Sequence, residues 1–229
     1  YLNRSLYIYI MKKVSVNLIR HGQTEYNLLG KIQGSSDIDL SEIGKEQAVN
    51  FNINKQEYYD IAYHSSLKRS EETLQIIANK LDILPKIEMC DLIIERRYGI
   101  FEGFTDEDIN NKYNEIYIKW KNNENTEIKN AETIENVIER IKKFIIILVK
   151  NEFGNVLAVT HSGVLFGLYK FITKTNLGER PPKINFKNCC STILNIYYDK
   201  YKINKLEFNI SNHTYEYSCS PTEFIIPTS

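Results

Sequence analysis

Residues 13–24, Lys-Val-Ser-Val-Asn-Leu-Ile-Arg-His-Gly-Gln-Thr, decide how this chain folds. The first seven residues alternate and then run apolar, which is typical of a β-strand. Such a strand delivers Arg20, His21 and Gly22 to its C-terminal end, and ligands bind at that end of the strands in open α/β sheets. We therefore predict an α/β fold that presents a histidine at the end of a strand.

A second segment repeats this arrangement. Residues 155–160, Asn-Val-Leu-Ala-Val-Thr, have the pattern of a buried strand in a parallel sheet, and His161, Ser162 and Gly163 follow directly. A lone histidine beside a strand is more often a packed residue than a catalyst. Two histidines in matching positions, each beside small residues that let a ligand approach the backbone, favour a functional site.

The remaining periodicity predicts further elements along the chain. They are a helix starting in residues 40–48 with Ser41 as its cap, a strand at 61–66, a helix over 70–81, a helix over 133–151 ended by Gly154, a helix over 164–172, and strands at 190–198 and 205–210. A charged segment with interleaved aromatics, 106–129, is expected to form a helical excursion over one end of the sheet.

Composition limits the classes of function. The 229 residues suit one domain, and equal counts of 29 basic and 29 acidic residues leave no global charge to recruit nucleic acid or membrane. The four cysteines form no Cys-x-x-Cys pair, so neither a zinc site nor a disulfide framework is expected. Apolar runs are too short to cross a bilayer. We expect a soluble cytoplasmic protein.

Around the two histidines the spacing becomes specific. The blocks, in chain order, are Arg20-His21-Gly22-x-Thr24-x-x-Asn27, Gln33-Gly34-x-x-Asp37-x-x-Leu40-Ser41-x-x-Gly44, Ser65-Ser66-x-x-Arg69-Ser70-x-x-Thr73, Glu95-Arg96-x-x-Gly99-x-Phe101-Glu102-Gly103, Glu132-Thr133 and Thr160-His161-Ser162-Gly163-Val164. Together they resemble the histidine phosphatase superfamily, also called the phosphoglycerate mutase-like family, over about residues 13–198. Several collinear blocks are a strong signal, whereas Arg-His-Gly alone would be weak.

The resemblance implies a fold and a domain plan. The fold is a three-layer α/β/α sandwich with a mostly parallel central sheet. The plan is an N-terminal extension at 1–12, a catalytic domain at 13–210 with a lid insertion at about 104–130, and a C-terminal tail at 211–229 that lacks a clear pattern.

The resemblance also implies roles for individual residues. His21 would attack phosphorus and form a phosphohistidine, while a backbone carbonyl in the following turn holds its other ring nitrogen. Glu95 would be the proton donor, since a carboxyl group can hold a proton near neutral pH when burial or a nearby anion disfavours its charge. His161 would be the second catalytic histidine, acting as a cation or donor. The substrate phosphate would be bound by Arg20, Asn27, Gln33, Gly34, Arg69 and Ser162. With such partners no metal is expected.

Three activities remain open within the family. A phosphatase is favoured, because Ser162-Gly163-Val164 after the histidine is close to a phosphatase pattern and the segment from Glu95 to Glu132 is shorter than the mutase insertion. Glu95-Arg96-Arg97-Tyr98-Gly99 instead is mutase-like. A phosphoglycerate mutase would need 2,3-bisphosphoglycerate, whereas a phosphatase needs no cofactor. The third alternative is a non-catalytic binding member.

The expected partner is a small phosphorylated substrate, and neither nucleic acid nor a membrane is expected. A homodimer is left open by tyrosines expected on the surface, Tyr58, Tyr59 and Tyr117.

Overall fold

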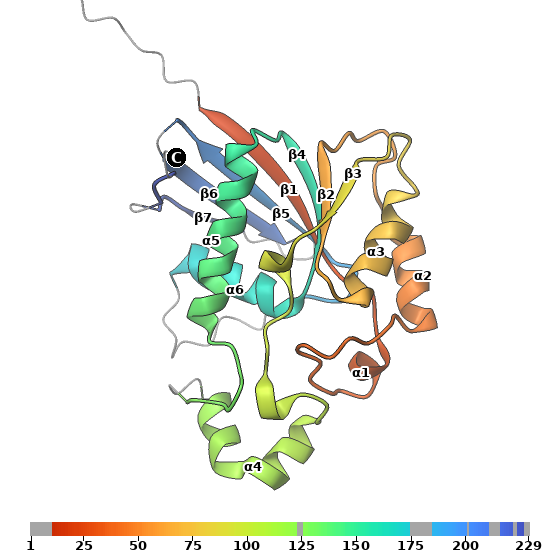
Figure 1. The fold of residues 1–229 in the computed structure, drawn as a ribbon, viewed down its shortest axis with the longest axis vertical. Coiled ribbons are helices and arrows are strands. Elements are labelled where there is room, and N and C mark those ends of the chain that lie inside the picture. Colours follow the sequence, from red (N-terminus) through yellow and green to blue (C-terminus); the bar gives the residue numbers. More distant parts are fainter. Residues whose placement is uncertain are drawn as a thin grey trace, which may run out of the picture.

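The strand predicted over residues 13–19 lies inside a central sheet (Figure 1). The computed structural model describes residues 11–122, 126–174, 185–200, 202–210, 216–221 and 224–226. Within these residues, seven strands form one sheet in the order β3-β2-β4-β1-β5-β6-β7. Their bounds are β1 Lys12–Arg20, β2 Ile61–His64, β3 Lys86–Met89, β4 Asn155–Thr160, β5 Ser191–Tyr198, β6 Ile203–Ile210 and β7 Glu216–Cys219.

The sheet has a parallel part and an antiparallel part. β1 pairs parallel with β4, β4 with β2, and β2 with β3. On the other side of β1, β5 joins antiparallel, and β6 and β7 continue in alternating directions. The sheet expected to be mostly parallel is therefore mixed, and its parallel half contains both strands that precede the histidines. The register places Arg20 opposite Thr160, so the residues after β1 and β4 meet at one end of the sheet.

Helices cover both faces of the sheet, which confirms the three-layer α/β/α sandwich. Those the structure describes are α1 Glu25–Leu28, α2 Glu42–Asn50, α3 Lys68–Ala78, α4 Asp106–Lys121, α5 Ile134–Lys150 and α6 Ser162–Thr173, with 3₁₀ turns at Asp91–Ile93 and Gly99–Phe101. None of these helices has the length and apolar character needed to cross a membrane within the described residues.

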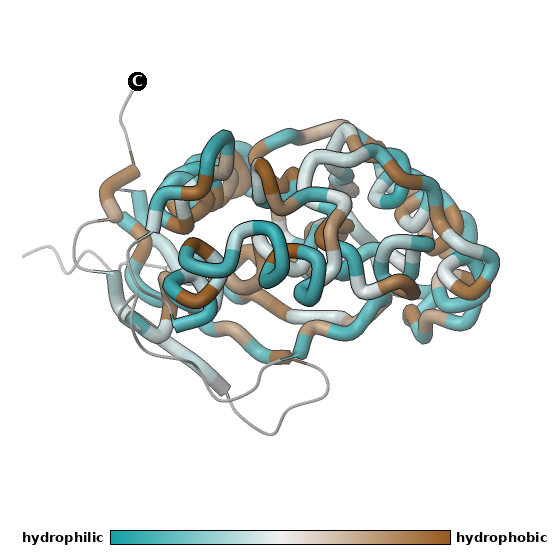
Figure 2. The backbone as a smooth tube through the Cα atoms, turned by 90° about the horizontal axis from the view of Figure 1, so that it is seen from below, coloured by the Kyte–Doolittle hydropathy of each residue, from teal (hydrophilic) through white to brown (hydrophobic). Residues whose placement is uncertain are grey.

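Alternate residues of β1 divide the core between the two faces. Val14, Val16 and Leu18 belong to the cluster that includes the buried sides of α5 and α6, whereas Ile19 belongs to the cluster with α3. Side chains one residue apart on a strand point to opposite faces, which explains this division. Figure 2 shows hydrophobic and hydrophilic segments alternating along the chain, as expected for helices that bury one side.

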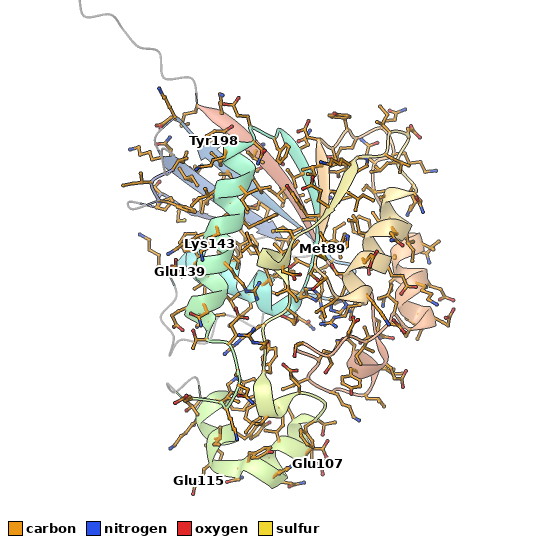
Figure 3. All side chains as sticks on the ribbon, in the orientation of Figure 1. Met89, Glu107, Glu115, Glu139, Lys143 and Tyr198 are labelled. Carbon is orange, nitrogen blue, oxygen red and sulfur yellow. The ribbon has the colours of Figure 1, made fainter. Side chains whose placement is uncertain are left out.

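The segment between the Glu95 block and the Glu132-Thr133 block forms the predicted helical excursion. A capping box at Thr105 begins α4, and Phe101 and Ile109 are fully buried in a small core of their own, separate from the two clusters at the sheet. Figure 3 shows Glu107 and Glu115 on the outer side of this helix. The excursion is thus attached to the sandwich but packed around its own aromatic side chains.

Several local expectations differ from the structure. The helix expected over 133–151 spans Ile134–Lys150, but Glu152, with φ 55°, takes the left-handed position after it rather than Gly154. Tyr59, expected on the surface, is 2% exposed. β7 lies in the region where no pattern was seen, and it extends the sheet beyond residue 210. Residues 1–10 of the proposed extension at 1–12 lie outside the described residues. The last residue of that extension, Lys12, is the first residue of β1.

A close approach between two glycines holds α2 against the turn that follows β1. A Cβ atom on Gly44 would lie 2.0 Å from the main-chain oxygen of Gln23, and one on Gly22 would lie 2.5 Å from the main-chain oxygen of Gly44. Both contacts are with backbone, which cannot move aside as a flexible side chain can. These two positions therefore require glycine for the close contact rather than for a special backbone angle.

Replacing Gly44 by alanine should destabilise the protein even though alanine favours helices. We expect Gly44→Ala to lower the free energy of unfolding by about 3 kcal/mol in urea titrations, because α2 or the turn must shift. Gly154→Ala is the control, since its Cβ would meet only the Asp60 carboxylate at 3.4 Å. Equal losses in the two variants would contradict the close-packing explanation.

Candidate active site

The two histidines predicted at strand ends lie side by side. Their ring centroids are 5.1 Å apart, and the side chains of His21 and His161 are 1% and 0% exposed. The main-chain N–H of His21 donates to the carbonyl of Thr160 at 3.0 Å, which continues the pairing of β1 with β4 past the last strand residue. Parallel pairing therefore brings together residues 140 positions apart in the sequence.

The turn after β1 fixes the orientation of the His21 ring. Nδ1 of His21 lies 2.7 Å from the main-chain oxygen of Gly22, which can only accept, so Nδ1 carries the proton. The unprotonated Nε2 is then the nitrogen available as a nucleophile. The N–H of Gly22 in turn donates to Oγ1 of Thr73 on α3 at 3.0 Å. The carbonyl predicted to hold the nucleophile is thus that of Gly22.

Two arginines approach the histidines, and main-chain carbonyls hold both of them. Arg69, in the first turn of α3, is fully buried and donates to the carbonyls of Ser36 at 2.6 Å and Gly34 at 2.9 Å. Arg20 donates to the carbonyl of Phe186. Nε of each arginine is buried and has no hydrogen-bond partner among the described residues. The two guanidinium groups therefore keep donors and charge that no side-chain carboxylate neutralises through a hydrogen bond.

Gly34 takes part in the site through its main-chain carbonyl. It has φ 51°, which glycine adopts without strain, and its carbonyl faces Arg69. A Cβ atom at this position would lie 2.1 Å from the Glu102 carboxylate. Glu102 accepts hydrogen bonds from the Ser35 hydroxyl at 2.7 Å and from the N–H of Tyr98 at 2.8 Å. Glu102 thus holds the loop that binds Arg69.

Burial and the arginines keep both histidines uncharged. Burial, then the charges of Arg20 and Arg69, hold the pKa of His21 well below its usual range. For His161 burial again acts first and Arg69 second, and its pKa is likewise well below the usual range. Burial also lowers the pKa of both arginines, which stay charged in proteins. Of the two forms expected for His161, cation or neutral donor, the neutral donor is the one this protein favours without a ligand.

His161 has one ring nitrogen bound and one free. Its Nε2 lies 2.7 Å from the hydroxyl of Ser65, and its Nδ1 is buried with no partner among the described residues. Ser65 Oγ in turn accepts from the N–H of Leu67. Sequence patterns placed Ser65 in a family block but gave it no role, and the structure shows that it orients the second histidine.

Glu95 lies beside the histidines at the start of α6. It is 6% exposed, and its Oε1 accepts hydrogen bonds from the main-chain N–H groups of Gly163 at 3.0 Å and Arg96 at 2.8 Å. The Ser162 hydroxyl donates to Oε2 at 3.3 Å. A carboxylate is favoured at a helix N-terminus because unpaired N–H groups and the helix dipole face it. Ser162, predicted as a phosphate ligand through its N–H, also contacts the predicted acid through its hydroxyl.

The residues around Glu95 are held in place by hydrogen bonds to α5 and to the segment that precedes α5. Nε of Arg96 donates to the carbonyl of Glu132 at 2.8 Å, and the Glu132 carboxylate pairs with Nε of Arg140 at 2.8 Å. Arg140 also donates to the carbonyl of Leu92 at 2.8 Å, just before Glu95. This partly buried network explains why a Glu132-Thr133 block accompanies the Glu95 block in the sequence. The Arg97 side chain is exposed, and only its main-chain carbonyl joins the network, accepting from the N–H of Glu132 at 2.9 Å.

Asn27 and Gln33 complete the predicted set. Oδ1 of Asn27 accepts from the N–H of Thr24 at 3.2 Å and from Nδ2 of Asn188 at 3.1 Å. Gln33 is buried, with Oε1 unpartnered among the described residues. Sequence reasoning missed Thr73, Phe186 and Asn188. Thr73 was visible as the last residue of the Ser65 block, whereas nothing local distinguishes the other two.

The described part of the chain holds no group of three or more His, Cys, Asp or Glu side chains arranged to bind a metal ion. What it does gather is two guanidinium groups, two neutral imidazoles and one carboxyl group. Fixed, buried donors of this kind are suited to a phosphoryl group, whose charge spreads over three oxygens. Fold and site thus define an enzyme that handles phosphate.

The chain belongs to the histidine phosphatase superfamily (branch 1), whose family model matches residues 16–209. The enzyme class predicted from the sequence, a histidine-type phosphomonoesterase, is confirmed at this level. A metal-independent phosphoserine phosphatase of Arabidopsis thaliana is 34% identical over 164 residues, 69% of this chain and 68% of that protein. A 2,3-bisphosphoglycerate-dependent phosphoglycerate mutase of Cytophaga hutchinsonii is 31% identical over 162 residues, 69% and 76% of the two chains.

Solved structures show the same fold. A phosphoserine phosphatase of Entamoeba histolytica, in complex with phosphoserine, superposes with a TM-score of 0.67 at 27% sequence identity, covering 79% of this chain and 90% of that one. Relatives of this chain thus include both phosphatases and mutases, as the sequence blocks indicated.

The neutral state of the two buried histidines has a measurable consequence. An unfolded histidine titrates near pH 6.5, about where the folded His21 and His161 still bind no proton. We expect ¹H–¹⁵N spectra to show both imidazoles neutral at pH 6, with assignments from His21→Asn and His161→Asn. Titration of either ring near pH 6.5 would contradict the electrostatic description.

The same shifts in the histidine pKa values should make the stability of the protein depend on pH. Because the unfolded chain takes up protons that the folded chain does not, the stabilisation is complete above about pH 6.5 and is lost as the pH falls toward the lower folded pKa values. In that window each histidine should add about 1.4 kcal/mol per pH unit to the slope of unfolding free energy. In urea titrations at a series of pH values, the slope of unfolding free energy against pH should be smaller for the His161→Asn variant than for wild type.

Proposed function

We propose that the protein hydrolyses small phosphate monoesters through a phosphohistidine on His21. The observation that carries this proposal is the state of His21: buried, neutral, with Nδ1 hydrogen-bonded to the Gly22 carbonyl and Nε2 left as the nucleophilic nitrogen. A neutral imidazole held in one tautomer is ready to attack phosphorus, and a covalent intermediate divides one difficult displacement into two easier ones.

In the first step Nε2 of His21 forms a bond to phosphorus while the ester P–O bond breaks. Arg20 and Arg69 bind the equatorial oxygens, and Nδ1 of His161, which has no partner among the described residues, donates to them. The alkoxide that leaves takes a proton from the Glu95 carboxyl group. In the second step water attacks the phosphohistidine, Glu95 takes up the proton of that water, and inorganic phosphate leaves with His21 restored.

Glu95 is supported in this role by its position. Its carboxyl group accepts from the main-chain N–H of Gly163 in the first turn of α6, two residues beyond His161, and from that of Arg96. A proton donor must be placed before its pKa matters. The Arg96–Glu132–Arg140 network restrains the chain on both sides of it.

We further propose that catalysis needs no metal ion. The two guanidinium groups supply the fixed positive charge that a metal would otherwise provide, and planar guanidinium binds phosphate through two parallel hydrogen bonds. The relative named a metal-independent phosphoserine phosphatase supports this reading. The substrate is proposed to be a small phosphorylated metabolite, and a phosphoserine-like compound belongs in the first panel tested.

Hydrolysis is preferred over mutase activity on two features. Ser162-Gly163-Val164 follows the second histidine, and α4 with its small core is a short insertion between Glu95 and Glu132. The mutase is the second candidate because Glu95-Arg96-Arg97-Tyr98-Gly99 is mutase-like and because a curated mutase is 31% identical. A mutase would use 2,3-bisphosphoglycerate to phosphorylate His21 and return the group to substrate.

The first experiment measures hydrolysis of p-nitrophenyl phosphate in excess EDTA. Wild type should turn over, and His21→Ala should lose on the order of 10³-fold or more, because the nucleophile is gone. His64→Ala is a matched control: Nδ1 of His64 contacts the next carbonyl, that of Ser65, at 2.8 Å, as His21 does with Gly22, but at the end of β2. It should retain turnover close to that of wild type.

Two outcomes would overturn this ranking. Turnover by wild type no greater than that of His21→Ala would reject the phosphatase. Interconversion of 3-phosphoglycerate and 2-phosphoglycerate with added 2,3-bisphosphoglycerate, at a rate above hydrolysis, would make the mutase the main activity.

A second experiment tests Glu95 as the proton donor. Glu95→Gln keeps the shape and the main-chain hydrogen bonds but cannot supply the proton. Hydrolysis of alkyl phosphates, whose leaving groups need a proton, should fall about 10²-fold or more, while p-nitrophenyl phosphate should lose much less. Equal losses on both substrates in steady-state assays would reject the role.

A further inference from the structure

Asn188 connects the nucleophile to a second side chain of the site. It lies three residues before β5 and is half-buried, and its Nδ2 donates to the main-chain oxygen of His21 at 3.0 Å and to Oδ1 of Asn27 at 3.1 Å. An amide NH2 group has two hydrogens, and both are used here. One nitrogen atom of Asn188 thereby joins His21 and Asn27, which lie 167 and 161 positions earlier in the chain.

Main-chain partners settle which way each amide faces. A carbonyl can only accept, so the atom of Asn188 that faces the His21 carbonyl is the NH2 group. A main-chain N–H can only donate, so the atom of Asn27 that lies 3.2 Å from the N–H of Thr24 is the oxygen. The Asn27 amide cannot be turned over without setting N–H groups against N–H groups. Its NH2 group is therefore the end left for another partner.

The segment that carries Asn188 is fastened to the end of β1. The N–H of Cys189 donates to the carbonyl of Arg20 at 2.9 Å, and the N–H of Arg20 donates to the carbonyl of Cys190 at 3.1 Å. The carbonyl of Phe186 accepts from the Arg20 guanidinium. Cys189 has φ 52°, a left-handed conformation that is strained for a non-glycine residue. These contacts retain that conformation and fix the position of Asn188.

We propose that Asn188 is a positioning residue of the phosphoryl-transfer site, which restrains the main chain of His21 and sets Asn27 to offer its NH2 group to the substrate phosphate. The proposal rests on the function proposed above. Its two effects are separable. The bond to the His21 carbonyl restrains the peptide that precedes Gly22, whose carbonyl holds the nucleophile. The bond to Asn27 decides whether a donor or an acceptor meets the phosphate.

The test is a double-variant cycle read out by phosphate-analogue binding. The dissociation constant of orthovanadate is measured for wild type, Asn188→Ala, Asn27→Ala and the double variant. Asn188→Ala should weaken binding about tenfold in the wild-type background, the value of one hydrogen bond to a charged group. In the Asn27→Ala background the same change should weaken binding less than about twofold, because the side chain it orients is gone.

Turnover measures the other effect, the restraint that Asn188 places on the main chain of His21. The kcat for p-nitrophenyl phosphate should fall on Asn188→Ala in both backgrounds, since the restraint on His21 is lost in each. Asn188→Asp, which matches the shape but cannot donate, should weaken orthovanadate binding at least as much as the alanine variant. Asn195→Ala is the control, because Asn195 lies on β5 and binds Ser15 away from the site. It should change neither value.

Two results would overturn the proposal. They are an unchanged orthovanadate affinity in Asn188→Ala, or an equal loss of affinity in the two backgrounds. Urea titration checks that each variant is folded, and Asn188→Ser replaces the alanine variant in the cycle, under the same criteria, if that variant does not fold. Absence of turnover by wild type would reject the proposed function, but the binding cycle would still decide the role of Asn188.

Discussion

Buried positive charge without a carboxylate partner is the constraint on which the site depends. Arg69 is fully buried, and Arg20 is largely enclosed, yet within the described residues both donate only to main-chain carbonyls. Taking a charge out of water is costly, and each bond to a carbonyl recovers part of that cost. Because a carbonyl carries no net charge, it satisfies a donor without cancelling the guanidinium. The charge remains for a ligand.

This requirement shapes the surrounding backbone. The Gly34 carbonyl can face Arg69 only because residue 34 adopts a left-handed conformation and leaves room for the Glu102 carboxylate. The Phe186 carbonyl reaches Arg20 from the segment that precedes β5. Loops that are distant in sequence therefore converge on the parallel half of the sheet, where β1 and β4 end together. Carbonyls in loops hold the guanidinium groups of the two arginines, whereas the two histidines directly follow strands.

The same division explains what the sequence could and could not predict. The strands before His21 and His161 were predictable because each has a local pattern of apolar residues followed by a small residue. β3 and β7 were not, because each has only four residues and lies at an edge of the described sheet, where burial imposes little pattern. Roles carried by main-chain carbonyls, such as that of Phe186, leave no signature in residue type. Asn188 meets His21 across 167 positions, and only the folded chain reveals that contact.

The family resemblance assigned roles to individual residues, and the structure adds the charge state of the two histidines. His161 was expected to be a cation or a donor, and burial first, then the charge of Arg69, keep this imidazole neutral by lowering its pKa. Those residues were described separately in the sequence blocks, but they act on one another through a buried, weakly screened field.

Under the proposed function, the resulting charge balance predicts a preference for a dianion. With both imidazoles neutral and Glu95 in the protonated form that the proposed first step requires, the fixed charge around Nε2 of His21 is that of two guanidinium groups, and a phosphate monoester at neutral pH carries nearly two negative charges. Bound together they approach neutrality, so the ligand removes the cost of the buried arginines while the arginines replace the water that the phosphate loses. A monoanion such as a phosphodiester would leave one guanidinium uncompensated in the same buried setting, and we therefore expect that residual charge, rather than shape, to disfavour it.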